Sequence, residues 1–185
     1  YLRLWYEKGL TTITISVVSH RPELNKKNYM QDNSDYINLP ELIDYLHDLK
    51  FCVRLTCVCC KNMMDNSQEV AEFIKFAKEN QVEQVTLRPV NDEYRRESAH
   101  LWILENKLTD ENKKDIKDYL EKNGTKLLEL ERIGTIYDVD GQNVLFSLPL
   151  TKYTRDTNPE NLRNLIFFQD GHIRYEWEME GGILL

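Results

Sequence analysis

The sequence predicts an α/β fold in which parallel strand–helix units form a partial (β/α) barrel, followed by a strand-rich C-terminal extension. Short β-branched stretches alternate with segments of helical periodicity, which is typical of parallel sheets with crossover helices. Each expected strand also has one apolar and one polar face, as in a barrel with a wet interior. We expect the strand–helix units in residues 1–105, and a helix with strand hairpins in residues 106–185.

The first elements follow from spacing and cap residues. Residues 1–9 are expected to end a helix, because Gly9 suits the position after a helix C-terminus. Residues 10–18 (LTTITISVV) alternate as a strand does. The polar segment 19–36 is expected to be a long loop, and long loops are often functional. The next helix is predicted at 39–49, after the N-cap candidate Asn38.

The middle of the chain repeats this order. A strand is predicted at 51–59 and another at 83–90, and residues 66–80 between them have the clearest helical period. Either Asp65 or Asn66 has the spacing of a capping box at the start of this helix.

From residue 91 on, the alternation of parallel strands and helices gives way to a linker, a helix and strand-rich segments. Residues 91–100 are expected to form a linker rich in Arg and Glu, and a helix is predicted at 109–122, capped by Thr109. Residues 126–148 and 163–178 are expected to be strand-rich, as an antiparallel extension or a small α+β cap. The predicted hairpin turns are Asp140-Gly141 and Asp170-Gly171.

Net charge, apolar content and the placement of the cysteines argue against several classes of protein. The net charge of −7 argues against a nucleic-acid partner held through phosphates, and no run of eighteen apolar residues predicts a membrane span. All four cysteines lie within nine residues, unlike a disulfide framework, so we expect free thiols and a cytoplasmic protein. The CxxC of Cys57 and Cys60 has no second ligand group, so no metal site is assigned.

The polar strand faces point to a ligand. Ser16, Arg54, Thr56 and Arg88 alternate with apolar residues, and ligands of parallel sheets bind beyond the carboxyl ends of the strands. Arg88 could hold a carboxylate, and the hydroxyls could bond ribose or amino-acid groups. The alternative is a solvated face, or one covered by the polar tail. Further candidates near these strand ends are Ser19, His20, Cys59 and Asn91.

A family resemblance adds detail. TISVVSH, VRLTCV and DNSQEVAEFIKFAKENQVEQVTLRPV resemble strands four to six, with their helices, of the radical S-adenosylmethionine (SAM) superfamily, over residues 10–92. The resemblance implies that Ser16, Ser19, Thr56 and Arg88 contact SAM. Arg54, His20, Cys59 and Asn91 are the candidate substrate contacts. Val18 stands where family members often have Asp, and Thr56 where they often have Asn.

The resemblance also implies cofactors. SAM and a [4Fe–4S] cluster are expected in the full-length protein, but the family's CxxxCxxC motif is absent from this sequence and would precede Tyr1. The chain is therefore expected to be a fragment that contributes part of a SAM and substrate cavity and assembles no cluster alone, with no catalytic residue assigned. The alternatives are another barrel enzyme binding an anionic substrate, or a non-catalytic interaction domain. We expect a small-molecule or peptide substrate, and the C-terminal extension is the candidate surface for a protein partner.

Overall fold

The structure is a computed structural model that describes residues 1–30, 35–90, 97–130, 133–147 and 166–174. The chain divides into two compact units, Tyr1–Thr151 and Lys152–Leu185. The first unit contains, in chain order, α1 (Leu2–Glu7), β1 (Thr12–Val17), α2 (Pro22–Tyr29), α3 (Leu39–Asp48), β2 (Cys52–Cys59), α4 (Ser67–Glu79), β3 (Gln84–Pro89), α5 (Glu97–Asn106), α6 (Asp110–Asn123), β4 (Thr125–Leu130), β5 (Gly134–Val139) and β6 (Gln142–Ser147).

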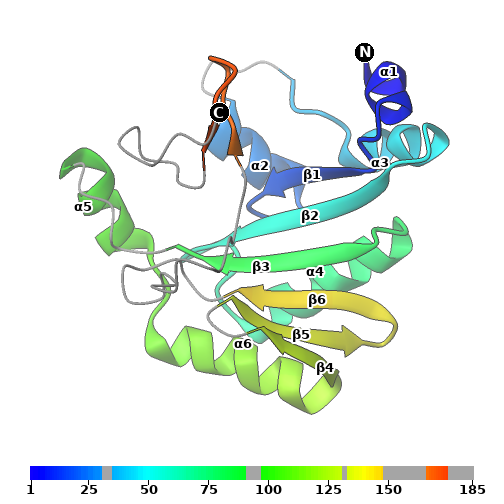
Figure 1. Cartoon of the computed structure of the whole chain (residues 1–185). Coiled ribbons are helices and arrows are strands. Elements are labelled where there is room, and N and C mark those ends of the chain that lie inside the picture. The colour runs from blue at the N-terminus through cyan, green and yellow to red at the C-terminus, as the bar shows by residue number, and fades with distance from the viewer. Residues whose placement is uncertain (31–34, 91–96, 131–132, 148–165, 175–185) are drawn as a thin grey trace. The chain divides into compact units, whose positions relative to one another are not determined.

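These strands form one six-stranded sheet in the order β1-β2-β3-β6-β5-β4 (Figure 1). The pairs β1–β2, β2–β3 and β3–β6 are parallel, whereas β5 is antiparallel to both β6 and β4. The predicted α/β architecture with parallel strands is confirmed, and the hairpin of β5 and β6 continues the same sheet because β6 pairs with β3. Among the described strands the sheet does not close into a barrel, since β1 and β4 are its two edges.

The helices of the first unit begin where their cap residues predict. The side chain of Asn38 accepts from the Glu41 N–H at the start of α3, and that of Asn66 accepts from the Glu69 N–H at the start of α4. Asn66, not Asp65, is therefore the N-cap. Thr109 forms a reciprocal capping box at the start of α6, which satisfies N–H groups that lack partners in the first turn.

Two helices occupy segments predicted to be loops. α2 lies inside the polar segment 19–36, and α5 begins within the expected linker 91–100. In α2 the only buried residue is Asn25, so the segment shows no apolar periodicity. Its helix signal is instead Pro22 at the first position, with Glu23 in the first turn.

The predicted turns are confirmed. Asp140 and Gly141 join β5 to β6 with φ values of 52° and 82°, the left-handed conformation that a two-residue hairpin turn requires. In the second unit, β7 (Ile166–Phe167) and β8 (Ile173–Arg174) pair antiparallel around Gly171, whose φ is 85°. The other residues of the predicted strand region 163–178 lie outside the described part of the chain.

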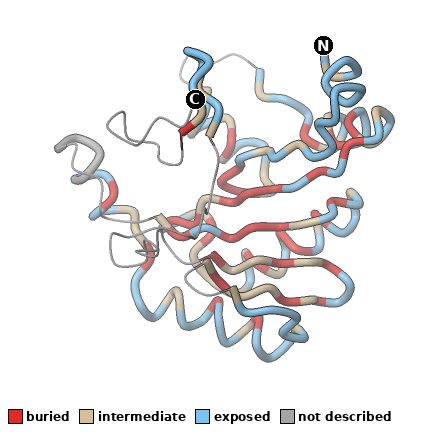
Figure 2. The backbone as a smooth tube through the Cα atoms, in the orientation of Figure 1, coloured by how far each residue is buried: buried red, intermediate tan, exposed pale blue. Residues whose placement is uncertain are grey.

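The core lies on one face of the sheet. Inward side chains of β2 and β3, such as Leu55 and Leu87, pack with the buried faces of α3, α4 and α6, which contribute Ile43, Phe73 and Ile116. Buried residues accordingly follow the central strands (Figure 2). Within the described ranges, none of the helices is long and apolar enough to cross a membrane.

Candidate ligand-binding face

Strand register places polar side chains of three neighbouring strands in one row. Ser16 of β1 is paired with Thr56 of β2, and Thr56 is paired with Thr86 of β3. Residues paired across a parallel sheet point to the same side, and so do residues two positions away along each strand. Arg54, paired with Gln84, and Arg88, paired with Val58, therefore share the face of this row. We call this surface of β1, β2 and β3 the uncovered face, because α3, α4 and α6 pack on the opposite one.

The polar residues of the uncovered face differ in exposure. Ser16, Arg54 and Arg88 are exposed, whereas Thr56 and Thr86 keep only 8% and 3% of their surface accessible. In the described part of the chain, the three hydroxyls make no hydrogen bond and the two guanidinium groups make no ion pair. Nearly buried hydroxyls usually find a hydrogen-bond partner, so a polar ligand on this face would satisfy them.

The two arginines lie at opposite ends of the face. Arg54 is paired with Gln84 of β3, and Arg88 lies four residues after Gln84 on the same strand. At the usual rise of a strand, the backbones of the two arginines are therefore about 13 Å apart along the strand direction. Arg88 directly precedes Pro89, the last residue of β3, so it is the arginine at the carboxyl ends of the strands. That is where ligands of parallel sheets bind.

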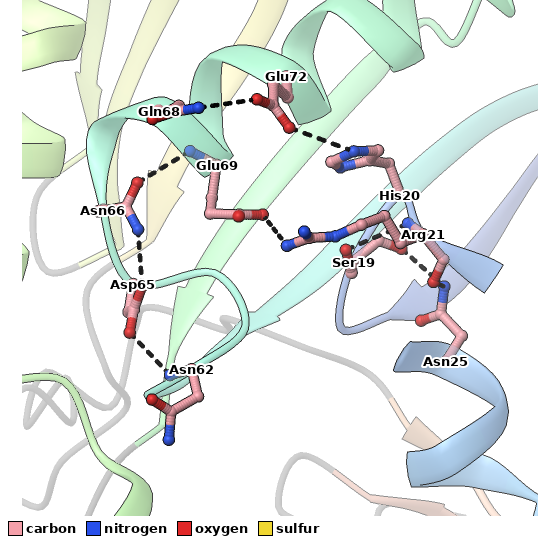
Figure 3. A network of polar contacts seen from close by, with 10 residues as sticks. All are labelled: Ser19, His20, Arg21, Asn25, Asn62, Asp65, Asn66, Gln68, Glu69 and Glu72. Atoms are coloured by element: carbon pink, nitrogen blue, oxygen red, sulfur yellow. Dashed lines mark hydrogen bonds and ion pairs between the residues drawn. The ribbon is translucent and has the colours of Figure 1, made fainter. Parts of the chain in front are cut away.

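Ser19 and His20 lie elsewhere, in a polar network between the loop after β1 and α4 (Figure 3). Ser19 is fully buried, and its hydroxyl accepts from the Arg21 N–H at 3.1 Å. His20 Nε2 lies 3.6 Å from a carboxylate oxygen of Glu72, and Arg21 is paired with Glu69 at 2.5 Å. Because both glutamates belong to α4, the network holds the loop on the helix-covered side. The structure thus does not bring Ser19 and His20 to the uncovered face.

Asn25 fixes this loop from α2. Its side chain is 1% exposed; it accepts from the Val18 N–H at 2.9 Å and donates to the Ser19 carbonyl at 2.7 Å. Asn25→Ala is expected to lower the free energy of unfolding by about 1–3 kcal/mol, because it leaves two buried backbone groups unpaired. Urea denaturation measures this change.

A matched control lies one turn further along α2. Among the described residues, the Asn28 side chain makes one hydrogen bond, to the Leu24 carbonyl of its own helix at 2.7 Å. Asn28→Ala should therefore cost less than about 1 kcal/mol. Equal effects of the two changes would show that Asn25 does not anchor the loop.

Three of the four cysteines, Cys57, Cys59 and Cys60, are buried, whereas Cys52 at the start of β2 is exposed. Cys59 is fully buried in the core on the helix-covered face, so it does not join Ser16 and Thr56. Burial raises the pKa of the Cys57 thiol well above its usual value and that of Cys60 to about 11, which disfavours the thiolates that metals bind. Among the described residues, no three His, Cys, Asp or Glu side chains form a metal-binding group. Asn91 lies outside the described residues.

Three further polar residues of the uncovered face were not among the predicted site residues, although alternation had placed Thr86 on the polar side of its strand. Thr86 is in the row, and Gln84 Nε2 donates to Asn143 Oδ1 at 2.6 Å on the same side. The alternation of Thr86 with Val85 and Leu87 is the signal that predicts its side of the sheet. No such signal existed for Asn143, because its place beside Gln84 depends on the pairing of β6 with β3, two strands that are distant in sequence.

No family model and no curated protein sequence matches this chain. Its function is therefore inferred from its own residues and their geometry.

Proposed function

We propose that this chain forms the SAM- and substrate-binding part of a radical SAM enzyme, with the uncovered face lining the cavity of a partial barrel. One observation carries the proposal: Ser16, Thr56 and Thr86 stand side by side on three parallel strands, with Arg88 on the same face near the strand ends. Helices on one side and unpaired polar groups on the other are what a barrel with a ligand in its interior requires.

The polar groups fit the chemistry of SAM. The ligand carries two ribose hydroxyls and an α-carboxylate. Hydroxyl side chains can both donate to and accept from ribose, and a guanidinium can hold a carboxylate through two parallel hydrogen bonds. Thr56 is only 8% exposed, so a hydrogen bond there would form in surroundings of low dielectric, where it is stronger than in water.

The cysteines of this chain do not fit a [4Fe–4S] cluster. The sequence has no CxxxCxxC, and the thiols of Cys57 and Cys60 are held protonated by burial. In this proposal the cluster ligands lie outside these 185 residues. The cluster and SAM supply the radical chemistry when bound, and the residues of the uncovered face bind and orient SAM.

A second candidate function follows from the two arginines. Arg54 and Arg88 are exposed and on one face, and neither is paired with a described carboxylate. An enzyme for an anionic substrate without SAM would use the same positive charges.

Calorimetric titration separates the two functions. Under the first, the chain binds SAM saturably and binds 5′-methylthioadenosine about 10–100-fold more weakly, because this analogue lacks the carboxylate that Arg88 would hold. Saturable binding of citrate or inorganic phosphate, with no heat from SAM, would support the second function. Binding of neither SAM nor an anion would contradict both.

A further inference from the structure

The strand β4 leaves one edge of the six-stranded sheet open. It lies at the opposite end of the sheet from β1, and within the described part of the chain its one strand partner is β5 (Figure 1). Five of its six residues are exposed and the last, Leu130, is half-buried, so no described helix covers this strand. Such an edge presents backbone N–H and C=O groups to which another strand can be added.

Two adjacent leucines occupy the centre of this edge. Leu127 has 53% of its surface exposed and Leu128 has 51%. Each would lose apolar surface to water if a further strand packed beside β4, and the removal of apolar surface from water is favourable. An edge strand with exposed apolar residues at its centre is therefore suited to a strand partner.

The two charged residues of β4 lie on one side of the sheet. Lys126 is paired with Tyr137 and Glu129 with Thr135, because the register shifts by one residue between Lys126 and Leu128. Tyr137 and Thr135 are two positions apart on β5 and so point to the same side. Lys126 and Glu129 consequently form an ion pair at the surface. Without the shift, residues three positions apart would point to opposite sides.

We propose that β4 pairs antiparallel with β4 of a second copy of this chain, so that the two sheets join across a two-fold axis. An axis between Leu127 and Leu128 sets Leu127 opposite Leu128 of the second copy, and Lys126 opposite its Glu129. The axis is perpendicular to the sheet and keeps each face on its own side, so the opposed charges meet on one side, twice by symmetry. Opposite charges directly across an antiparallel pair are stabilising.

This complementarity holds in one register. Edge charges and register irregularities often keep strands apart, but on β4 both are matched by a second copy of the same strand. A slip by one residue in either direction would set Lys126 opposite Leu128 or Leu130, and an in-register parallel pairing would set lysine against lysine. The pattern of charges on β4 therefore fits a second copy of the chain as the partner.

Sedimentation equilibrium over a wide concentration range tests the proposal. Wild type is expected to dimerise reversibly. Lys126→Glu and Glu129→Lys each place like charges opposite one another at both symmetric contacts, so each should raise the dimer Kd about tenfold or more. Lys75→Glu is the control, because it reverses the same charge in another surface ion pair, with Glu79 of α4 at 3.8 Å. Its Kd should stay within about twofold of wild type.

Mixing the two edge variants gives the decisive result. In a heterodimer, both glutamates of the Lys126→Glu chain face both lysines of the Glu129→Lys chain, so an equal mixture should dimerise about as tightly as wild type. Both variants keep a net negative charge, so overall attraction between the chains would not explain this recovery. The recovery also shows that both variants are folded. The proposal is overturned if wild type stays monomeric, if either edge variant dimerises like wild type, or if the mixture remains as weak as its components.

Discussion

Arg88→Ala is expected to weaken SAM binding by about 10–100-fold. A hydrogen bond to a charged group contributes about 1.5–3 kcal/mol, and Arg88 is the exposed guanidinium at the carboxyl ends of the parallel strands. Because its side chain is exposed and makes no described ion pair, the change should not alter the fold. Calorimetric titration of the variant measures the loss directly.

Arg54→Ala is the control, because it removes the same residue type from the same face. Arg54 lies about 13 Å from Arg88 along the strands, so the α-carboxylate of SAM cannot reach both. SAM affinity should stay within about twofold of wild type in this variant. If the Arg54 change weakened SAM binding as much as the Arg88 change, a general charge effect would replace the proposed specific contact.

Phe73→Ala is expected to lower the free energy of unfolding by about 3–5 kcal/mol. Phe73 is fully buried in α4 and belongs to the core between this helix and the sheet. Truncating a buried aromatic side chain removes its transfer free energy and leaves a cavity that the surroundings fill only partly. Such a loss is a large share of a typical domain's stability. The midpoint of urea denaturation reports it.

Tyr45→Ala gives the comparison for an aromatic residue at the surface. Tyr45 lies on α3 with 52% of its surface exposed, so little apolar area returns to water when it is truncated. A loss below about 1 kcal/mol is expected. If Phe73→Ala cost no more than Tyr45→Ala, α4 would not pack on the sheet as described.

The sequence was sufficient for the local structure and for the faces of the sheet. Alternation in 10–18, 51–59 and 83–90 predicted three strands with a polar and an apolar side, and the register places Ser16 and Thr56 on one side as a parallel sheet requires. Asn38 and Thr109 marked helix starts because their side chains satisfy backbone N–H groups locally. Such information is contained in a few neighbouring residues.

Features that depend on contacts between residues far apart in the sequence could not be predicted from the sequence. α2 was missed because it has no apolar stripe, and its buried residue Asn25 bonds Val18 and Ser19 outside the helix. His20 was expected near the strand mouths, yet its contact with Glu72 of α4 holds it on the helix-covered side. The place of β6 beside β3 likewise follows from a pairing that no local pattern encodes.

NMR mapping of SAM on the isotope-labelled chain tests the central proposal most directly. The signals of Ser16, Thr56, Thr86 and Arg88 should shift together in a saturable way. Those of residues in the helix-covered core, such as Phe73, should stay in place. Saturable shifts confined to α3, α4 and α6, with the uncovered face unchanged, would contradict the account.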